Sequence, residues 1–203
     1  MDSENSIILS GRMEEAPVYD HTVLGEAFYK TRVAARRLSG TEDVLPVTLS
    51  ERLLTGIDAL PGAGSFVSID GQLRSYNRRD GAGRHLVLTV FARGARFQTE
   101  PIPDENDVYL IGCVCKPVVY RTTPFMREIA DLLIAAPRRY GKSDYLPVIA
   151  WGRNARFASA LETGDRVALT GRMQSRIYRK QLEDGNCEER TAYEISVSGI
   201  ERV

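Results

Sequence analysis

The chain has 203 residues, of which 27 are Lys or Arg and 27 are Asp or Glu, so its formal net charge at pH 7 is zero. This length suits one large or two small domains, and no apolar run is long enough to cross a bilayer. The balanced charge provides no overall attraction to nucleic acid, although a local basic stripe can supply phosphate contacts where the total does not.

The first half of the chain alternates between strand-like and turn-like segments. An apolar strand ends at Gly11, and leucine and isoleucine recur at helical spacing after Glu51. The pattern predicts strands over 6–11, 27–37 and 44–49, a helix over 51–60, and strands over 66–79 and 84–93.

The second half repeats this order after a stretch with two prolines, 94–106, which we interpret as a semi-rigid linker. The pattern predicts strands over 107–115, 128–138 and 144–151, a short helix over 154–161, and strands over 165–180 and 189–197.

The repetition extends to individual residues. Shifted by 101 positions, the sequence aligns with itself without a gap from 5 to 52, and farther on the offset becomes 100. Repeated residues include Asn5 with Asn106, Gly11 with Gly112, Asp43 with Asp144, Gly71 with Gly171, and Ser75 with Ser175. Because this period exceeds the roughly 20 to 50 residues of solenoid units, each copy should have its own core.

Five strands with one helix between the third and fourth is the arrangement of the OB-fold. This fold is a five-stranded Greek-key barrel whose sheet face and loops bind oligonucleotides or oligosaccharides. We therefore predict an all-β protein of two tandem OB-folds, with an N-terminal barrel over 1–93, the linker over 94–106 and a C-terminal barrel over 107–203.

The fourth strand of the C-terminal copy separates core from candidate binding face, because alternate strand residues point to opposite sides. We expect the barrel lining to be Val167, Leu169, Gly171, Met173, Ser175 and Ile177. The opposite face carries three cations, one amide and one aromatic ring: Arg172, Gln174, Arg176, Tyr178 and Lys180. On single-stranded nucleic acid, cations follow the phosphates and aromatic rings stack on bases. Basic residues that only solubilise a strand would not explain why the stripe returns in both copies.

The third strand of the C-terminal copy adds two rings. Tyr145 and Trp151 share one face, and Tyr140 lies in the preceding basic turn with Arg138 and Arg139. Taken alone, the sole tryptophan fits a core anchor as well as a stacking platform.

The N-terminal copy has a basic stripe but lacks these rings. Its candidate binding residues are Arg74, Tyr76 and Arg78 on the fourth strand, with Lys30 and Arg32 on the second. Ser39, Val44, Ser50 and Arg78 stand where the other copy has Tyr140, Tyr145, Trp151 and Tyr178. We therefore expect base stacking chiefly in the C-terminal copy.

No catalytic, cofactor or metal motif appears, and we expect neither His21 nor His85 to have a neighbouring carboxylate or cysteine partner. We expect no enzyme activity, no cofactor and no metal. Three cysteines without a C-x-x-C pair are expected to be buried small hydrophobes in a cytoplasmic protein. The acidic N-terminus predicts no secretory signal.

Several of these segments resemble the bacterial single-stranded DNA-binding protein family. Gly71-Gln72-Leu73-Arg74-Ser75 and Gly171-Arg172-Met173-Gln174-Ser175 are similar to that family's fourth strand, and 144–155 is similar to its third strand and helix. The resemblance covers nearly all of 107–200 and, more loosely, 6–93.

This resemblance implies that Tyr140, Tyr145, Trp151 and Tyr178 stack on bases. It also implies a homodimer that presents four OB-folds, as in family members with two folds per chain. The segment 198–203 is not the acidic tail of typical members, so we expect no recruitment of partners through such a tail.

The leading hypothesis is sequence-independent binding and protection of single-stranded DNA in replication, recombination or repair, without a membrane or a small-molecule substrate. Two alternatives stay open: an OB-fold interaction module of a primosome or conjugation complex, and single-stranded RNA binding by the same stacking physics. Uncharged strand faces over 27–35 and 128–136 are candidates for packing between barrels.

Overall fold

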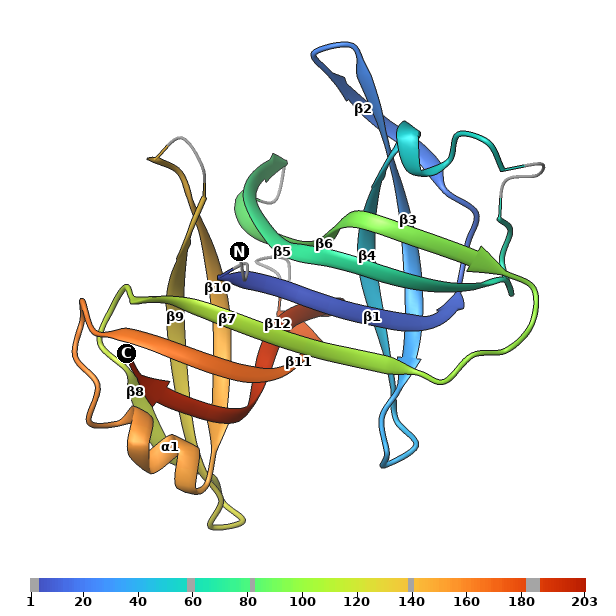
Figure 1. Ribbon diagram of the computed structural model, residues 1–203. Helices are drawn as coiled ribbons and strands as arrows, with labels where there is room; N and C mark the ends of the chain where they lie inside the picture. The colour runs from blue at the N-terminus through green and yellow to red at the C-terminus, as the bar shows by residue number, and fades with distance from the viewer. Residues whose placement is uncertain (1–3, 58–60, 81–82, 139–140, 182–186) are drawn as a thin grey trace.

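The structure, a computed structural model, describes residues 4–57, 61–80, 83–138, 141–181 and 187–203 (Figure 1). The first copy contributes β1 (Asn5–Met13), β2 (Val18–Val23), β3 (Glu26–Arg36), β4 (Glu42–Ser50), the 3-10 turn η1 (Glu51–Leu53), β5 (Phe66–Asp80) and β6 (Gly83–Gln98). The second copy contributes β7 (Glu105–Val114), β8 (Val119–Thr122), β9 (Glu128–Pro137), β10 (Ser143–Trp151), α1 (Arg153–Ala158), β11 (Arg166–Gln181) and β12 (Cys187–Arg202).

Each copy closes into a barrel of five strands. In the first copy β1 pairs with β5 and, at its far end, with β3, while β4 pairs with β3 on one side and runs parallel to β6 on the other. The second copy repeats this ring with β7, β9, β10, β12 and β11, and its parallel pair is β10 with β12. The predicted tandem OB-folds are therefore confirmed.

The alternation of strand residues fills both barrels with apolar side chains. Leu9, Leu45, Leu73 and Val90 are fully buried in the first barrel, and Leu110, Leu146 and Met173 occupy the corresponding places in the second. Burial of these side chains supplies the main driving force for each barrel.

Three details of the fold differ from those predicted from the sequence. A hairpin strand precedes the second barrel strand in each copy, β2 in one and β8 in the other. In the first copy the expected helix over 51–60 is only the turn η1, while residues 58–60 lie outside the described part of the chain. Residues 94–98 and 105–106, assigned to the linker, belong to β6 and β7, so the connection is 99–104.

Repeated glycines allow the barrel strands to bend closely around one another. A Cβ on Gly11 would lie 2.1 Å from the Ala34 carbonyl oxygen, and one on Gly112 would lie 2.5 Å from the Ala135 oxygen. Gly71 and Gly171 sit at register shifts in β5 and β11, where a Cβ would also meet backbone. The repeat of these glycines therefore reflects backbone contact rather than turn formation.

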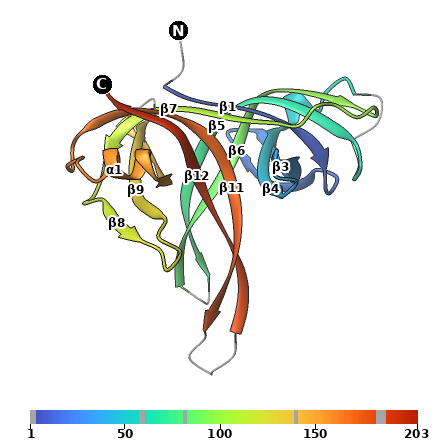
Figure 2. The same cartoon turned by 90° about the horizontal axis from the view of Figure 1, so that it is seen from below.

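The two barrels share a continuous sheet because β1 pairs antiparallel with β7. The register is symmetric: Asn5 opposes Leu110, the repeat partner of Leu9, and Leu9 opposes Asn106, the repeat partner of Asn5. The chain therefore forms an internal pseudo-twofold pair of barrels, with the central sheet running across both (Figure 2).

The hairpins β5–β6 and β11–β12 project from the same side of this sheet (Figure 2). Within the barrel the predicted lining of β11 holds, since Val167, Leu169 and Met173 are buried. Ile177 is 69% exposed, which corrects its assignment to the lining. It lies on the part of the hairpin that extends beyond the barrel, where no core covers either face.

The cysteines are not buried as expected. Cys113 and Cys187 are exposed and Cys115 is partly exposed. Cys113 lies on the outer side of β7, where the barrel core does not reach. No helix in the described residues is long and apolar enough to span a membrane.

We predict that Gly11→Ala lowers the free energy of unfolding by about 3 kcal/mol, because the new methyl group overlaps a backbone oxygen that cannot move independently. Gly94→Ala is the matched control, since a Cβ there meets nothing within 4 Å, and should change stability by less than about 1 kcal/mol. Urea denaturation measures both variants. Equal effects would contradict the close-contact explanation.

Candidate nucleic-acid interface

The outer face of β10 carries the aromatic residues predicted for the third strand. Tyr145 is 47% exposed and Trp151 is 40% exposed, while Leu146, Val148 and Ala150 point into the barrel. Trp151 is thus a surface residue rather than a core anchor. The two rings are six positions apart along the strand, so their Cα atoms are roughly 20 Å apart, far enough to contact different nucleotides.

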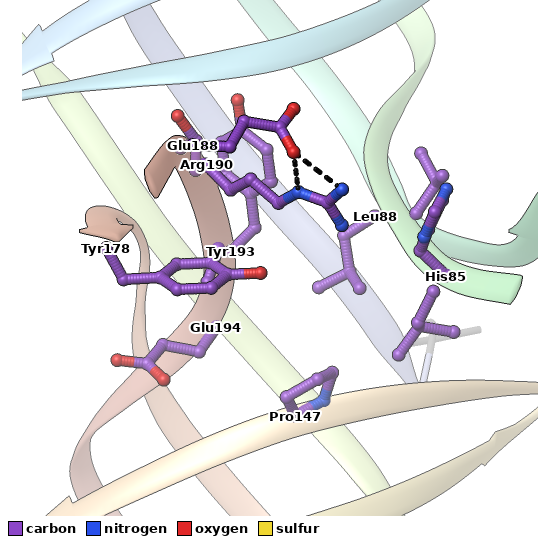
Figure 3. Close-up of a pocket in the computed structure, with 12 residues that line it drawn as sticks. His85, Leu88, Pro147, Tyr178, Glu188, Arg190, Tyr193 and Glu194 are labelled. Atoms are coloured by element: carbon purple, nitrogen blue, oxygen red, sulfur yellow. Dashed lines mark hydrogen bonds and ion pairs between the residues drawn. The ribbon is translucent and has the colours of Figure 1, made fainter. Parts of the chain in front are cut away.

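A groove of about 690 Å³ lies between the two projecting hairpins (Figure 3). Residues 85–88 of β6 form one wall, and β12, with Tyr178 of β11 and Pro147 of β10, forms the rest. Arg190 contributes a guanidinium that is paired with Glu188 at 2.7 Å. The groove therefore joins strands from both copies and places a predicted stacking ring on its wall.

The outward residues of β11 are only partly as predicted. Tyr178 is 36% exposed and Arg176 places its guanidinium carbon 5.8 Å from the Tyr178 ring centre, a cation–π arrangement. Gln174 is buried and donates to Glu194, so it is not an exposed contact residue. Arg172 is half-buried, and its Nε is buried without a hydrogen-bond partner among the described residues. The side chain of Lys180 lies outside what the structure describes.

Two predicted phosphate contacts are instead bound to a buried carboxylate. Asp144 is fully buried, and Arg138 donates to both of its oxygens at 2.5 and 2.6 Å. Arg74, from the other copy, donates to the same carboxylate at 3.0 Å. The Arg74 contact therefore connects the two barrels, whereas Arg138 binds the carboxylate from within its own copy. Their neighbours Arg139 and Tyr140 lie outside the described residues.

Backbone groups extend this connection in both directions. The Ser75 amide donates to Asp144 at 2.6 Å, and the Tyr145 amide donates to the Ser75 hydroxyl at 2.7 Å. The repeat partners do the same across the pseudo-twofold axis, because the Ser175 amide donates to Asp43 at 2.8 Å. Hydrogen bonds of charged groups in a buried setting are among the stronger ones in proteins. They fix the hairpin of each copy against β4 or β10 of the other.

The basic residues predicted on β3 are engaged with acidic neighbours. Lys30 pairs with Asp20 at 2.6 Å, and Arg32 pairs with Glu15 at 3.0 Å. Burial acts to lower the pKa of Lys30, but its contacts with Asp20 and Tyr76 outweigh this effect and raise the pKa above its usual value. Both cations stay protonated at neutral pH, and Tyr76 and Arg78 are exposed on β5.

Sequence reasoning missed an aromatic group in the N-terminal copy. His21 and Phe28 stack with ring centres 5.2 Å apart, and Phe28 lies 5.9 Å from Phe91. The parity that selected Lys30 and Arg32 also places Phe28 on that face, so this residue could have been found. His21 could not, because its strand was not predicted. Among the described residues there is no cluster of three or more potential metal ligands.

A closed five-stranded barrel with one parallel pair of strands defines each copy as an OB-fold, and the second barrel exposes aromatic rings on its outer sheet. Residues 105–203 match the single-strand binding protein family. The C-terminal half of the chain is therefore similar to this family, as the sequence resemblance indicated.

One curated relative is single-stranded DNA-binding protein 1 of Streptococcus pyogenes, which is 30% identical over 83 residues. The match covers 37% of this chain and 64% of the relative, so the chain spans slightly less than two thirds of that relative's length.

Two similar solved structures are of the single-stranded DNA binding protein from Thermus aquaticus. A deletion variant superposes with a TM-score of 0.73 at 20% identity, and the match covers 98% of this chain and 94% of that one. The wild-type protein gives a TM-score of 0.70 at 21% identity, covering 98% and 92%. Because both matches cover nearly the whole chain, they show that both copies share the fold of the Thermus aquaticus protein. At these identities they show the fold alone.

We predict that Asp144→Asn destabilises the protein by about 3 kcal/mol. The neutral amide would leave the positive charges of Arg74 and Arg138 without the buried negative charge that pairs with them. Asp131→Asn is the matched control, since Asp131 pairs with Arg121 on an exposed surface and should cost less than about 1 kcal/mol. Thermal and urea unfolding compare the two. A loss no larger than that of the control would contradict the bridging role.

Proposed function

We propose that this protein binds single-stranded DNA with little sequence preference and holds it unpaired during replication, recombination or repair. The observation that carries the proposal is the exposed position of Trp151, Tyr145 and Tyr178 on the outer sheet and groove of the family-matched barrel. Rings exposed in this way present their faces to bases that a duplex would hide. The names of the similar proteins, which are single-stranded DNA-binding proteins, support the same assignment.

Affinity has two physical sources in this proposal. Exposed cations such as Arg176 and Arg78 neutralise phosphates and release counterions, which makes binding dependent on salt. Stacking adds roughly 1 to 3 kcal/mol per base. Neither source distinguishes one base strongly from another, so preference for sequence should be small.

We further propose a homodimer that presents four barrels. The outer face of β1 and β7 exposes Ile8 and Tyr109, at 45% and 38%, on the same side of the central sheet. The outward side of β3 carries Lys30 and Arg32, so it is not the uncharged face that the sequence suggested. The face of β1 and β7 is therefore the better candidate for contact with a second chain.

We predict that Trp151→Ala or Tyr178→Ala weakens binding of oligo-dT by about 5- to 150-fold, which corresponds to one lost stack. Tyr76→Ala should have a smaller effect, because Tyr76 contacts Lys30 rather than standing free in the groove. Fluorescence anisotropy of labelled oligonucleotide measures the affinities, and melting temperatures confirm folding. Equal losses for all three variants would contradict a site centred on the C-terminal barrel.

We also predict that Trp151 fluorescence is quenched by oligo-dT, because the protein has one tryptophan and it is exposed. The logarithm of the binding constant should fall with the logarithm of salt concentration, with a slope of about −0.7 per neutralised phosphate. Titrations with matched RNA and duplex DNA complete the test. Tighter binding of duplex would contradict the proposal, and tighter binding of RNA would favour the RNA alternative.

A further inference from the structure

We propose that the N-terminal barrel has its own stacking site for unpaired bases, formed by His21, Phe28 and Phe91 and bounded by the guanidinium of Arg74. We call these three rings the ring ladder. The inference rests on the proposed function and extends it to the copy that lacks rings at the positions of Tyr140, Tyr145, Trp151 and Tyr178.

The ring ladder crosses most of the outer sheet of the first barrel. His21 on β2 and Phe28 on β3 lie nearly parallel, with 17° between their planes and 5.2 Å between centres. Phe28 and Phe91 on β6 are tilted by 40° at 5.9 Å. The Arg74 guanidinium on β5 lies 5.9 Å from the Phe91 ring centre. Four strands thus contribute to one continuous row of flat groups.

These rings lie outside the hydrophobic core. The core residues Val33 and Ala35 on β3 and Val90 and Ala92 on β6 have the opposite parity, although the small side chains of Ala34 and Thr89 are also buried on the side of the rings. Phe28 and Phe91 are half-buried and belong neither to the core cluster nor to the partly buried residues packed against it. Core packing therefore does not account for two phenylalanines on this face, whereas stacking on a ligand does.

The charges around the ring ladder suit a polyanion with flat bases. Lys30, which pairs with Asp20, is the next outward residue after Phe28 on β3, and Arg74, which also binds Asp144, lies over the far end of the row. Cations interleaved with aromatic rings match the alternation of phosphate and base along a single strand. A double helix, whose bases are stacked on one another, offers no free base face to such a row.

The same face continues toward the groove between the hairpins. Arg32 follows Lys30 outward on β3 and interacts electrostatically with Tyr193 of the other copy. Burial raises the pKa of Tyr193, and nearby Arg32 opposes this shift. Tyr193 lines the groove in Figure 3. One single strand of DNA can therefore run from the ring ladder, past Arg32 and Tyr193, to Tyr178.

The test compares a short and a long oligo-dT on the full chain. About 8 nucleotides fill one barrel's site, whereas about 30 are enough to reach both. Phe28→Ala combined with Phe91→Ala should weaken binding of the long oligonucleotide by about 5- to 150-fold for each lost stack. It should leave the quenching of Trp151 by the short oligonucleotide unchanged. Phe157→Ala, which removes a partly exposed ring on α1, is the matched control.

The outcomes separate this inference from the function on which it rests. If the double variant binds both lengths as the wild type does, the ring ladder is not a stacking site. If neither oligonucleotide quenches Trp151 fluorescence in the wild type, the proposed function itself is contradicted, whatever the double variant does.

A second variant keeps the ring and adds a reporter, in case the alanine variants are unstable. Phe28→Trp in a Trp151→Phe background places the only indole in the ring ladder, and the long oligo-dT should quench its fluorescence. Phe157→Trp in the same background should not be quenched. An indole at position 28 that responds no more than the control overturns the inference.

Discussion

The antiparallel pairing of β1 with β7 is the constraint on which the rest of the molecule depends. It gives the two barrels one shared sheet and a pseudo-twofold relation, and so sets both long hairpins on the same side. The buried carboxylates of Asp43 and Asp144 then bind the hairpin of the opposite copy through Ser175 and Ser75. Because such carboxylates are costly to bury unless fully paired, the two barrels are held in one relative position. The groove between the hairpins exists only in that position.

The connection between the barrels is not fully symmetric, and the reason is an exchange of two side chains. In β5 the outward pair is Gln72 and Arg74, whereas in β11 it is Arg172 and Gln174. In each pair the arginine hydrogen-bonds the glutamine, but only Arg74 reaches the carboxylate of the other copy. Among the described residues, Asp144 therefore pairs with two arginines, whereas Asp43 pairs with one, Arg37.

The two copies use different strands to expose aromatic rings. The C-terminal copy places Tyr145 and Trp151 on β10 and Tyr178 on β11, whereas the N-terminal copy places its rings on β2, β3 and β6. Stacking requires only that a ring face solvent on the outer sheet beside cations, so no particular strand is needed. Loss of the rings at equivalent positions is thus compatible with a nucleic-acid site in each barrel.

The repeat, the OB-fold of each copy and the outward parity of Tyr145, Trp151 and Tyr178 could be predicted from the sequence, because strand alternation and glycine placement are local properties. Short segments also indicated the family that the C-terminal half resembles. Only the tertiary structure decided that Arg74 and Arg138 share the carboxylate of Asp144, that Ile177 lies beyond the core, and that His21, Phe28 and Phe91 form one row. Those facts depend on contacts between residues distant in the chain, which the closure of the barrels and the pairing of β1 with β7 bring together.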